Sequence, residues 1–199
     1  TILTEVPEMF GAETLLMNRC ANRKLFDETV SLINDFKQYF KDNHQTIYEN
    51  PSPGNKKGGI STLEDKSLGC TQKSGSAPVC GVLSYGERVK TPGLNLLSAP
   101  GNDLVAATAL AASGAHIVLF TTGRGTPFAS AVPTVKISSN STLAGKKKNW
   151  IDFNAGVLVE DAELDAVGQQ LFDYVIDVAS GRKVCSEEAG FHDMAIFKQ

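Results

Sequence analysis

Apolar residues recur at steps of three and four positions along two long stretches of the chain, which predicts two amphipathic helices. The first lies within residues 22–41, with Asn22 as its expected N-cap. Its apolar face consists of Phe26, Val30, Ile33, Phe36 and Phe40. The second covers residues 161–180 and ends before Gly181. Its apolar face consists of Leu164, Val167, Leu171, Val175 and Val178.

Shorter apolar runs between these helices predict β-strands. They cover residues 94–97, 117–120 and 134–137, and weaker strands are expected at 79–83 and 87–89. The alanine-rich segment 104–113 predicts a helix that ends at Gly114. A strand, a short helix and another strand in this order are typical of a right-handed crossover in one parallel sheet. We therefore predict an α/β protein with a Rossmann-like, mostly parallel sheet, flanking helices and an N-terminal helical segment.

The chain is expected to form one domain made of three segments. These are a helical segment at 1–48, an α/β core with site loops at 49–160, and a C-terminal helix and tail at 161–199. Residues 49–62 are rich in proline and glycine and are expected to lack regular structure. A short helix is expected at 62–69, with Gly69 at its C-terminal cap.

Composition and charge exclude several classes of protein. Of the 199 residues, 42% are hydrophobic and 21% are charged, which is ordinary for a globular protein. The net charge of −3 gives no basic surface for nucleic acid or an anionic membrane. No apolar stretch approaches the roughly 18 residues of a membrane span. The 4 cysteines lack metal-binding spacing and are expected to be reduced thiols of a cytoplasmic protein.

Two loops are expected to follow strand ends, where open parallel sheets bind ligands. Residues 99–103 lead into a helix whose free N–H groups can hold a carboxylate or a phosphate. Residues 121–126 place Arg124 between two glycines, and a guanidinium binds a carboxylate through paired hydrogen bonds. The alternative is that both loops are ordinary turns, with Arg124 in a surface ion pair. The glycine patterns of dinucleotide-binding turns and phosphate-binding loops are missing, so nucleotide binding has little support.

Several charged side chains, in or just after the segment 49–62 and at expected strand ends, are candidates for chemistry. Lys56, Lys57 and Lys66 could neutralise a bound carboxylate, or act as a base if the pKa of the amine is lowered. The alternative is that these lysines are simply solvated. Asp103 and Asp152 follow expected strand ends, where an aspartate binds a metal, transfers a proton or, more commonly, caps a turn.

Several strings of residues form a specific combination along the chain. They are T-E-V-P-E-M-F-G-A-E (4–13), N-P-S-P-G-N-K-K-G-G (50–59), T-L-E-D-K-S-L-G (62–69), A-P-G-N-D (99–103), F-T-T-G-R-G (120–125), P-T-V-K-I-S-S-N (133–140) and W-I-D-F-N-A-G (150–156). Together they resemble the C-terminal part of sugar-acid dehydratases of the altronate/galactarate dehydratase family. The variants present here are closer to the altronate branch than to the galactarate branch.

The resemblance implies a hydro-lyase. Enzymes of the family remove water from an aldonic or aldaric acid to give a 2-keto-3-deoxy acid. For D-altronate the product is 2-dehydro-3-deoxy-D-gluconate, in hexuronate catabolism. The family needs a divalent metal, usually taken as iron(II), and the resemblance assigns no ligand for it here.

The resemblance also implies partners for this chain. Family members are longer at the N-terminus, and the chain starts at Thr1 rather than at a methionine. We therefore expect it to be the C-terminal domain of a longer enzyme and to be inactive alone. Its expected partners are a sugar acid and the N-terminal remainder of the same enzyme, with a homo-oligomer as an open alternative.

The reaction sets physical demands that residues of this chain suit. The proton on C2, beside the carboxylate, is weakly acidic, so its removal requires a base and strong stabilisation of an enediolate-like anion. An acid must then protonate the departing C3 hydroxyl. An anion-binding helix end, an arginine between glycines and several lysines suit such a substrate.

Positions that match the family strings carry over as hypotheses about roles. Lys66 or Lys136 is expected to be the base or a charge neutraliser. Asp103, Asp152 or Glu5 is expected to assist proton transfer or metal binding. Arg124 and the turn at 101–103 are expected to bind the substrate. The full set of substrate-binding candidates is Asn55, Gly58, Gly59, Ser67, Gly101, Thr121, Thr122, Gly123, Arg124, Gly125 and Asn154.

Three alternatives stay open. The chain could belong to a dehydratase of the galactarate type. It could be an α/β module that binds a sugar acid or a nucleotide without catalysis. It could also serve assembly, through contacts of the aromatic face of the helix at 22–41.

Overall fold

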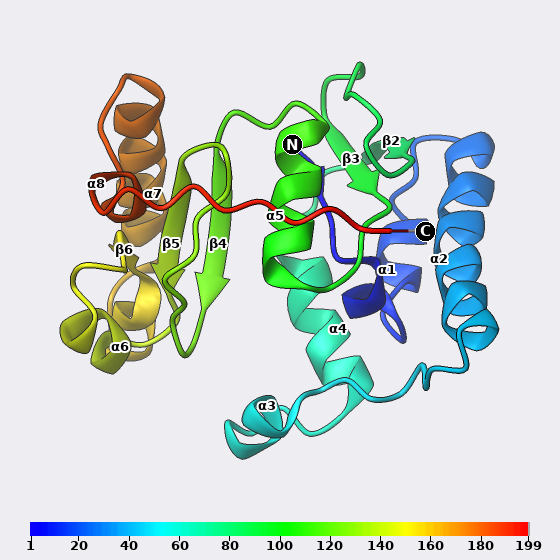
Figure 1. The fold of residues 1–199 in the computed structure, drawn as a ribbon, viewed down its shortest axis with the longest axis horizontal. Helices are drawn as coiled ribbons and strands as arrows, with labels where there is room; N and C mark the ends of the chain where they lie inside the picture. Colours follow the sequence, from blue (N-terminus) through cyan, green and yellow to red (C-terminus); the bar gives the residue numbers. More distant parts are fainter. Residues whose placement is uncertain (199) are drawn as a thin grey trace. The chain divides into compact units, whose positions relative to one another are not determined.

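The computed structural model describes residues 1–198, which form two units that each contain a parallel three-stranded sheet (Figure 1). Unit 1 comprises residues 1–114 together with the tail from Ile196, and unit 2 comprises Ala115–Ala195. The predicted α/β class is confirmed. The division at Gly114 differs from the boundaries of the expected segments. The expected segments are based on composition, whereas the two units reflect which strands pair with each other.

The sheet of unit 1 has the strand order β1-β3-β2, with all strands parallel. Its strands are β1 (Ile2–Leu3), β2 (Val79–Leu83) and β3 (Leu94–Leu97). All four residues of β3 are buried, as expected for a central strand of a parallel sheet. Because the strands run in the same direction, their carboxyl ends lie at the same edge of the sheet.

Unit 1 also contains several helices. They are the 3₁₀ helix η1 (Val6–Met9), α1 (Thr14–Met17), α2 (Arg23–Asp42), α3 (Pro53–Lys57), α4 (Leu63–Gln72) and α5 (Asp103–Ala112). Asn22, Thr62 and Asn102 act as N-caps, since each side-chain oxygen accepts a hydrogen bond from the N–H three residues further along. The helices expected at 22–41 and 104–113 are confirmed.

The aromatic face of α2 packs into the core of unit 1. Phe36 is buried and stacks on Phe197 of the tail, with 6.1 Å between ring centroids. Phe40 meets Phe10 edge to face at 6.1 Å. The face is therefore used within the unit, and the assembly alternative that relied on it loses its basis.

Three local expectations in unit 1 are wrong. The segment 49–62 contains α3, because Ser52 caps the helix and Pro53 takes the first helical position, where its fixed φ is favourable. Helix α4 continues through Gly69, which does not adopt the positive φ of a helix stop. Residues 87–89 form no strand.

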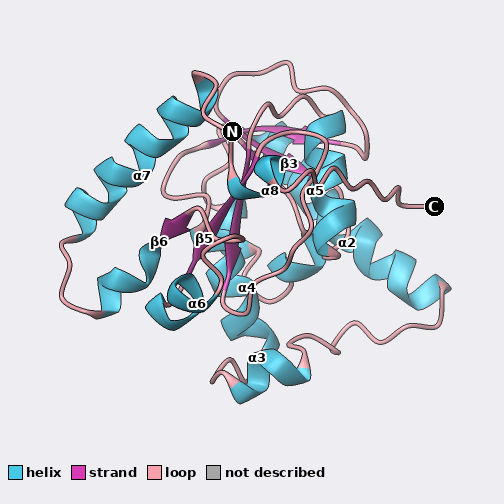
Figure 2. Cartoon of the chain, turned by 60° about the vertical axis from the view of Figure 1, so that its left-hand side comes forward, coloured by secondary structure: helices cyan, strands magenta, loops and turns pink. Residues whose placement is uncertain are grey.

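The sheet of unit 2 has the order β4-β5-β6, again with all strands parallel. Its strands are β4 (Val118–Thr122), β5 (Thr134–Ser138) and β6 (Phe153–Asn154), and its helices are α6 (Ser141–Lys146), η2 (Ala155–Val159), α7 (Leu164–Ala179) and α8 (Cys185–Glu188). Figure 2 shows these short strands in magenta beside the longer helices. The core of unit 2 contains Val135, Ile137, Val178 and Val184.

The expectation of one continuous sheet is wrong. Strand β3 pairs with β1 and β2, whereas β4 pairs along its whole length with β5, from Val118 opposite Thr134 to Thr122 opposite Ser138. Helix α5 thus connects two sheets instead of crossing over one. Periodicity identified the strands, but it carries no information on which strand lies beside which.

The apolar face predicted for the last helix is buried only in part. Val167 and Val178 of α7 are buried, whereas the Leu164 side chain is 68% exposed. Across residues 1–198, no helix is both long enough and apolar enough to cross a membrane.

Candidate functional site

Charged side chains gather in unit 1 where β1 and β3 end. Glu5 and Glu8 follow β1, and a hydrogen bond from the Val6 N–H to the Ala99 carbonyl (3.0 Å) fixes this turn beside the end of β3. Helix α4 packs against η1 and contributes Lys66. We call Glu5, Glu8, Lys66 and Lys73 the strand-end cluster. Ligands of open parallel sheets bind at such strand ends.

Glu8 is the most buried member of the strand-end cluster, with 8% of its side chain exposed. Its Oε2 lies 3.1 Å from Lys66 Nζ, and its Oε1 accepts a hydrogen bond from Asn50 Nδ2 at 3.2 Å. Gly101 leaves room for this carboxylate, because a Cβ at that position would lie 3.1 Å from Glu8 Oε1. The sequence therefore provides Glu8 with one charged partner, one polar partner and a glycine beside it.

Glu5 combines an unusual backbone with a shifted pKa. Its φ of 70° lies in the left-handed region, which non-glycine residues adopt mainly where the structure forces them to, often at functional sites. Burial raises the pKa of Glu5, and the nearby Glu8 and Asp103 carboxylates raise it further against the opposing effect of Lys73, whose Nζ lies 3.7 Å away. A carboxyl group that keeps its proton to higher pH can act as a general acid.

The structure favours one of the two roles expected for Lys66. Burial works to lower the pKa of Lys66, but the Glu8 and Glu5 carboxylates outweigh it and the pKa is raised. A lysine that stays protonated neutralises a bound carboxylate and cannot serve as the base. Asp103 lies at the start of α5, and partial burial of its carboxyl group raises the pKa.

The remaining expected residues of unit 1 make no side-chain hydrogen bond or ion pair with the strand-end cluster among the described residues. Asn55 belongs to α3, Gly58 caps it, and Gly59 adopts a positive φ of 97°. Ser67 follows Lys66 in α4, and its fully buried Oγ has no hydrogen-bond partner within residues 1–198. The same holds for the buried Oγ1 of Thr4, the residue before Glu5.

Unit 2 carries a separate strand-end turn. Thr122 Oγ1 accepts a hydrogen bond from the Gly125 N–H (2.9 Å), and Asn140 Nδ2 donates to the Gly123 carbonyl (3.0 Å). These bonds hold the turn at the carboxyl ends of β4 and β5. Arg124 and Thr121 are exposed, and Arg124 makes no ion pair with any of the residues described.

Asn154, at the end of β6, connects two neighbouring elements of unit 2. Its Nδ2 donates to Ser141 Oγ (2.9 Å), and its Oδ1 accepts from the Gly156 N–H (2.9 Å). Both ends of the amide are therefore occupied within the unit.

Lys136 and Asp152 are held inside unit 2. Lys136 is 1% exposed and donates from Nζ to the Thr126 carbonyl at 2.7 Å, and burial lowers the pKa of its amine. Asp152 accepts hydrogen bonds from the Lys136 N–H (2.8 Å), the Cys185 N–H (2.8 Å) and Tyr174 Oη (3.4 Å). These contacts favour structural roles over the expected roles in catalysis.

Two members of the strand-end cluster were missed from the sequence. Glu8 follows Glu5 by three residues, and one turn of a 3₁₀ helix places such residues on the same side. Lys73 follows Lys66 by seven residues, which is two turns of an α-helix. Glu8 and Lys73 could have been identified from their spacing to Glu5 and Lys66, which were already candidates.

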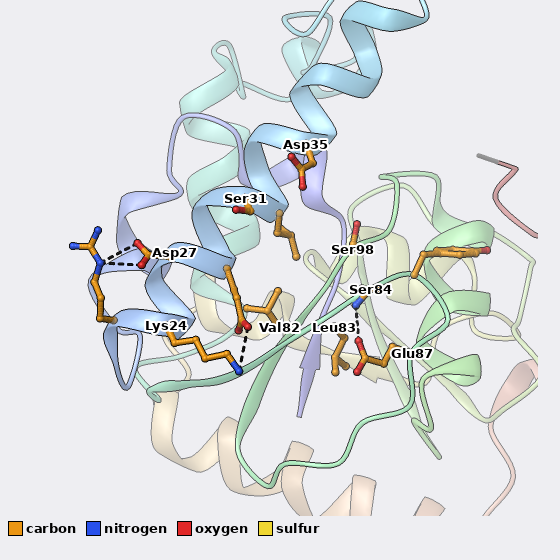
Figure 3. Close-up of a pocket in the computed structure, with 13 residues that line it drawn as sticks. Lys24, Asp27, Ser31, Asp35, Val82, Leu83, Ser84, Glu87 and Ser98 are labelled. Carbon is orange, nitrogen blue, oxygen red and sulfur yellow. Dashed lines mark hydrogen bonds and ion pairs between the residues drawn. The ribbon is translucent and has the colours of Figure 1, made fainter.

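A groove of about 1040 Å³ in unit 1 contains none of the expected site residues. Figure 3 shows Asp27, Ser31 and Asp35 along α2, and Leu83 and Ser84 at the end of β2 also line the groove. The charged residues on the α2 side pair with each other, as in Arg23 with Asp27 at 2.9 Å. Such exposed pairs one helical turn apart are typical of a solvated helix face.

The described side chains do not form a metal centre. Within residues 1–198, no three His, Cys, Asp or Glu side chains are grouped so that they could hold a metal ion. Burial raises the pKa of the Cys70 thiol, beside the strand-end cluster, to about 12, which disfavours the thiolate that a nucleophile requires.

Fold and site together define a class: α/β proteins with two parallel sheets, carboxylates and lysines at one set of strand ends, and an exposed arginine at another. Such groups suit small acidic ligands. The chain belongs to the D-galactarate/altronate dehydratase family, because the model of the C-terminal region of that family matches residues 1–199. The resemblance predicted from the sequence strings is thereby confirmed.

Individual relatives agree with this assignment. The chain is 61% identical to altronate dehydratase of Escherichia coli (strain K12) and 63% identical to altronate dehydratase of Bacillus subtilis (strain 168), in both cases over 100% of the chain and 40% of the relative. It is 36% identical to galactarate dehydratase (L-threo-forming) of E. coli, over 98% of the chain and 38% of that protein. The chain thus spans about 40% of the length of the altronate dehydratases it matches.

Proposed function

We propose that this chain is the C-terminal domain of a hydro-lyase that converts D-altronate into 2-dehydro-3-deoxy-D-gluconate and water. The observation that carries this proposal is the identity of 61–63% to two altronate dehydratases along the whole chain, against 36% to a galactarate dehydratase. The strand-end cluster supports it independently, because an acidic sugar needs cations for its carboxylate and a group that transfers a proton.

In this proposal the strand-end cluster binds and protonates the substrate. Lys66 and Lys73 bind the substrate carboxylate and offset the negative charge that develops when the C2 proton is removed. Glu5, whose pKa is raised by burial, gives its proton to the departing C3 hydroxyl, which leaves as water. The enol that remains tautomerises to the 2-keto acid. The base that removes the C2 proton is not assigned to a residue of this chain.

The proposal includes a divalent metal, which the family resemblance identifies as iron(II). No step of the proposed reaction is assigned to it. The described side chains offer no set of three ligands for it. We place its ligands in the remaining length of an enzyme built like the relatives, which are about 2.5 times as long as this chain because the chain covers 40% of each. A cytoplasmic location and a role in hexuronate catabolism are further parts of the proposal.

Arg124 provides a test of the unit 2 turn. We expect Arg124→Ala in the full-length enzyme to raise the KM for D-altronate about 10-fold. This corresponds to the binding free energy lost with one charge-assisted hydrogen bond. The thermal midpoint should not change, because the side chain is exposed and makes no ion pair among the described residues. Steady-state kinetics measure the effect, and Lys148→Ala, which removes another exposed cation of unit 2, is the control. An unchanged KM would exclude Arg124 from substrate binding.

The proposed activity is tested by assaying the full-length protein for 2-keto acid formation with and without iron(II). The panel contains D-altronate, galactarate and other sugar acids. We expect the highest kcat/KM with D-altronate. A preference for galactarate would move the protein to the other branch of the family. Sugar-acid or nucleotide binding in calorimetry without any product would instead favour a binding module.

A further inference from the structure

We propose that Glu8 is a positioning residue, whose buried carboxylate holds the Lys66 ammonium group at the strand ends so that it meets the substrate carboxylate. This inference rests on the proposed function in one respect, namely that Lys66 binds the substrate. It adds a residue that the family resemblance did not single out and a specific way in which that residue acts.

The contacts of Glu8 show that the carboxylate is fixed in place. Its oxygens are divided between two partners, with Asn50 Nδ2 at 3.2 Å from Oε1 and Lys66 Nζ at 3.1 Å from Oε2. The Glu8 N–H donates to the Glu5 carbonyl at 2.8 Å, so the two glutamates belong to one rigid turn. A buried carboxylate is costly unless it is paired, and Lys66 is its charged partner.

Lys66 remains accessible on its other side. Its side chain is 28% exposed, compared with 8% for Glu8, so Glu8 contacts the amine from the buried side while part of the Lys66 side chain stays accessible. The charged and titratable groups around Lys66 are Glu8 and Glu5 after β1, and Cys70 in α4. Lys73 after α4 and Asp103 of α5 belong to the same electrostatic environment. The two glutamate carboxylates keep the Lys66 ammonium group charged. A charged ammonium group is what attracts the carboxylate of a substrate.

The test uses Glu8→Gln in the full-length enzyme, with two measurements. Steady-state kinetics should show a KM for D-altronate that is about 10- to 100-fold higher, with a smaller change in kcat, because a misplaced ammonium group mainly weakens binding. Competitive acetylation, followed by mass spectrometry across a pH series, reports the proton on Lys66. Loss of the Glu8 charge makes the protonated amine less stable, so Lys66 should become reactive at a lower pH than in the unchanged enzyme.

Glu13→Gln is the matched control. Glu13 forms a comparable pair with Lys37 at 2.7 Å, with 19% and 29% of the two side chains exposed, but it lies outside the strand-end cluster. This variant loses a half-buried ion pair and should leave both the KM and the acetylation of Lys66 unchanged. A general effect of breaking a Glu–Lys pair would appear equally in both variants.

If Glu8→Gln does not fold, Glu8→Asp replaces it, because aspartate keeps the charge and withdraws the carboxylate by one methylene group. A raised KM in Glu8→Asp would support the positioning role. Unchanged KM and unchanged Lys66 acetylation in a folded variant would overturn it. The acetylation measurement does not depend on turnover, so an enzyme that lacks altronate activity would refute the proposed function without hiding the result for Glu8.

Discussion

Glu5→Gln in the full-length enzyme is expected to lower kcat on the order of 10³-fold, while the KM for D-altronate changes little. Removal of a general acid or base costs about 10²- to 10⁴-fold. Glutamine has the same shape as glutamate, so the left-handed backbone at this position and the packing around it are kept. What it cannot do is give a proton to the departing hydroxyl.

The pH profile provides a second signature of the same role. If kcat requires protonated Glu5, it falls as pH rises through the pKa of this group, which burial raises above its ordinary value. The Gln variant should lose that limb of the profile. Asp35→Asn removes a carboxylate from the groove along α2 and is the control, with kcat expected to stay unchanged. Near-normal turnover in Glu5→Gln would remove Glu5 from the reaction.

The largest effect on stability is expected for Gly156→Ala in unit 2. A Cβ at Gly156 would overlap the backbone of Asn140 and Ser141, where η2 packs against the start of α6. Backbone atoms cannot rotate away as a side chain can, so the start of α6 must shift. We expect the free energy of unfolding to fall by about 3 kcal/mol.

Urea unfolding of the 199-residue chain measures this effect. Trp150 is the single tryptophan of the chain and lies in unit 2, so its fluorescence reports on the affected unit. Gly145→Ala is the control, because a Cβ at that helical position would meet no atom of residues 1–198 within 4 Å beyond its chain neighbours and its own helix backbone. It should be neutral or stabilising by up to about 1 kcal/mol. Equal midpoints for the two variants would contradict the packing described for Gly156.

Local patterns predicted most of the helices and strands but not their partners. The apolar periodicity of residues 22–41 and the cap at Asn22 identified α2 closely. The same method placed β3 and β4 in one sheet, since pairing between distant strands leaves no local trace. Strand β1 contains two residues, too few for any periodicity, although its end positions the strand-end cluster.

The site was predicted in part for comparable reasons. The family strings pointed to Glu5 and Lys66, which the fold brings into one cluster, and their roles stay predictions. A family string made Lys136 a candidate and strand-end position made Asp152 one, but hydrogen bonds inside unit 2 occupy both. Sequence shows where a charged residue falls along a strand, whereas only the folded unit shows whether its polar atoms are already used.

The central claim is that the strand-end cluster of unit 1 binds the carboxylate of an acidic sugar. A crystal structure of the full-length enzyme with a non-reactive analogue of D-altronate tests it most directly. We predict the carboxylate of the analogue within hydrogen-bond distance of Lys66 Nζ, with its C3 substituent facing Glu5. An analogue bound elsewhere, with Lys66 and Glu5 out of reach, would contradict the claim.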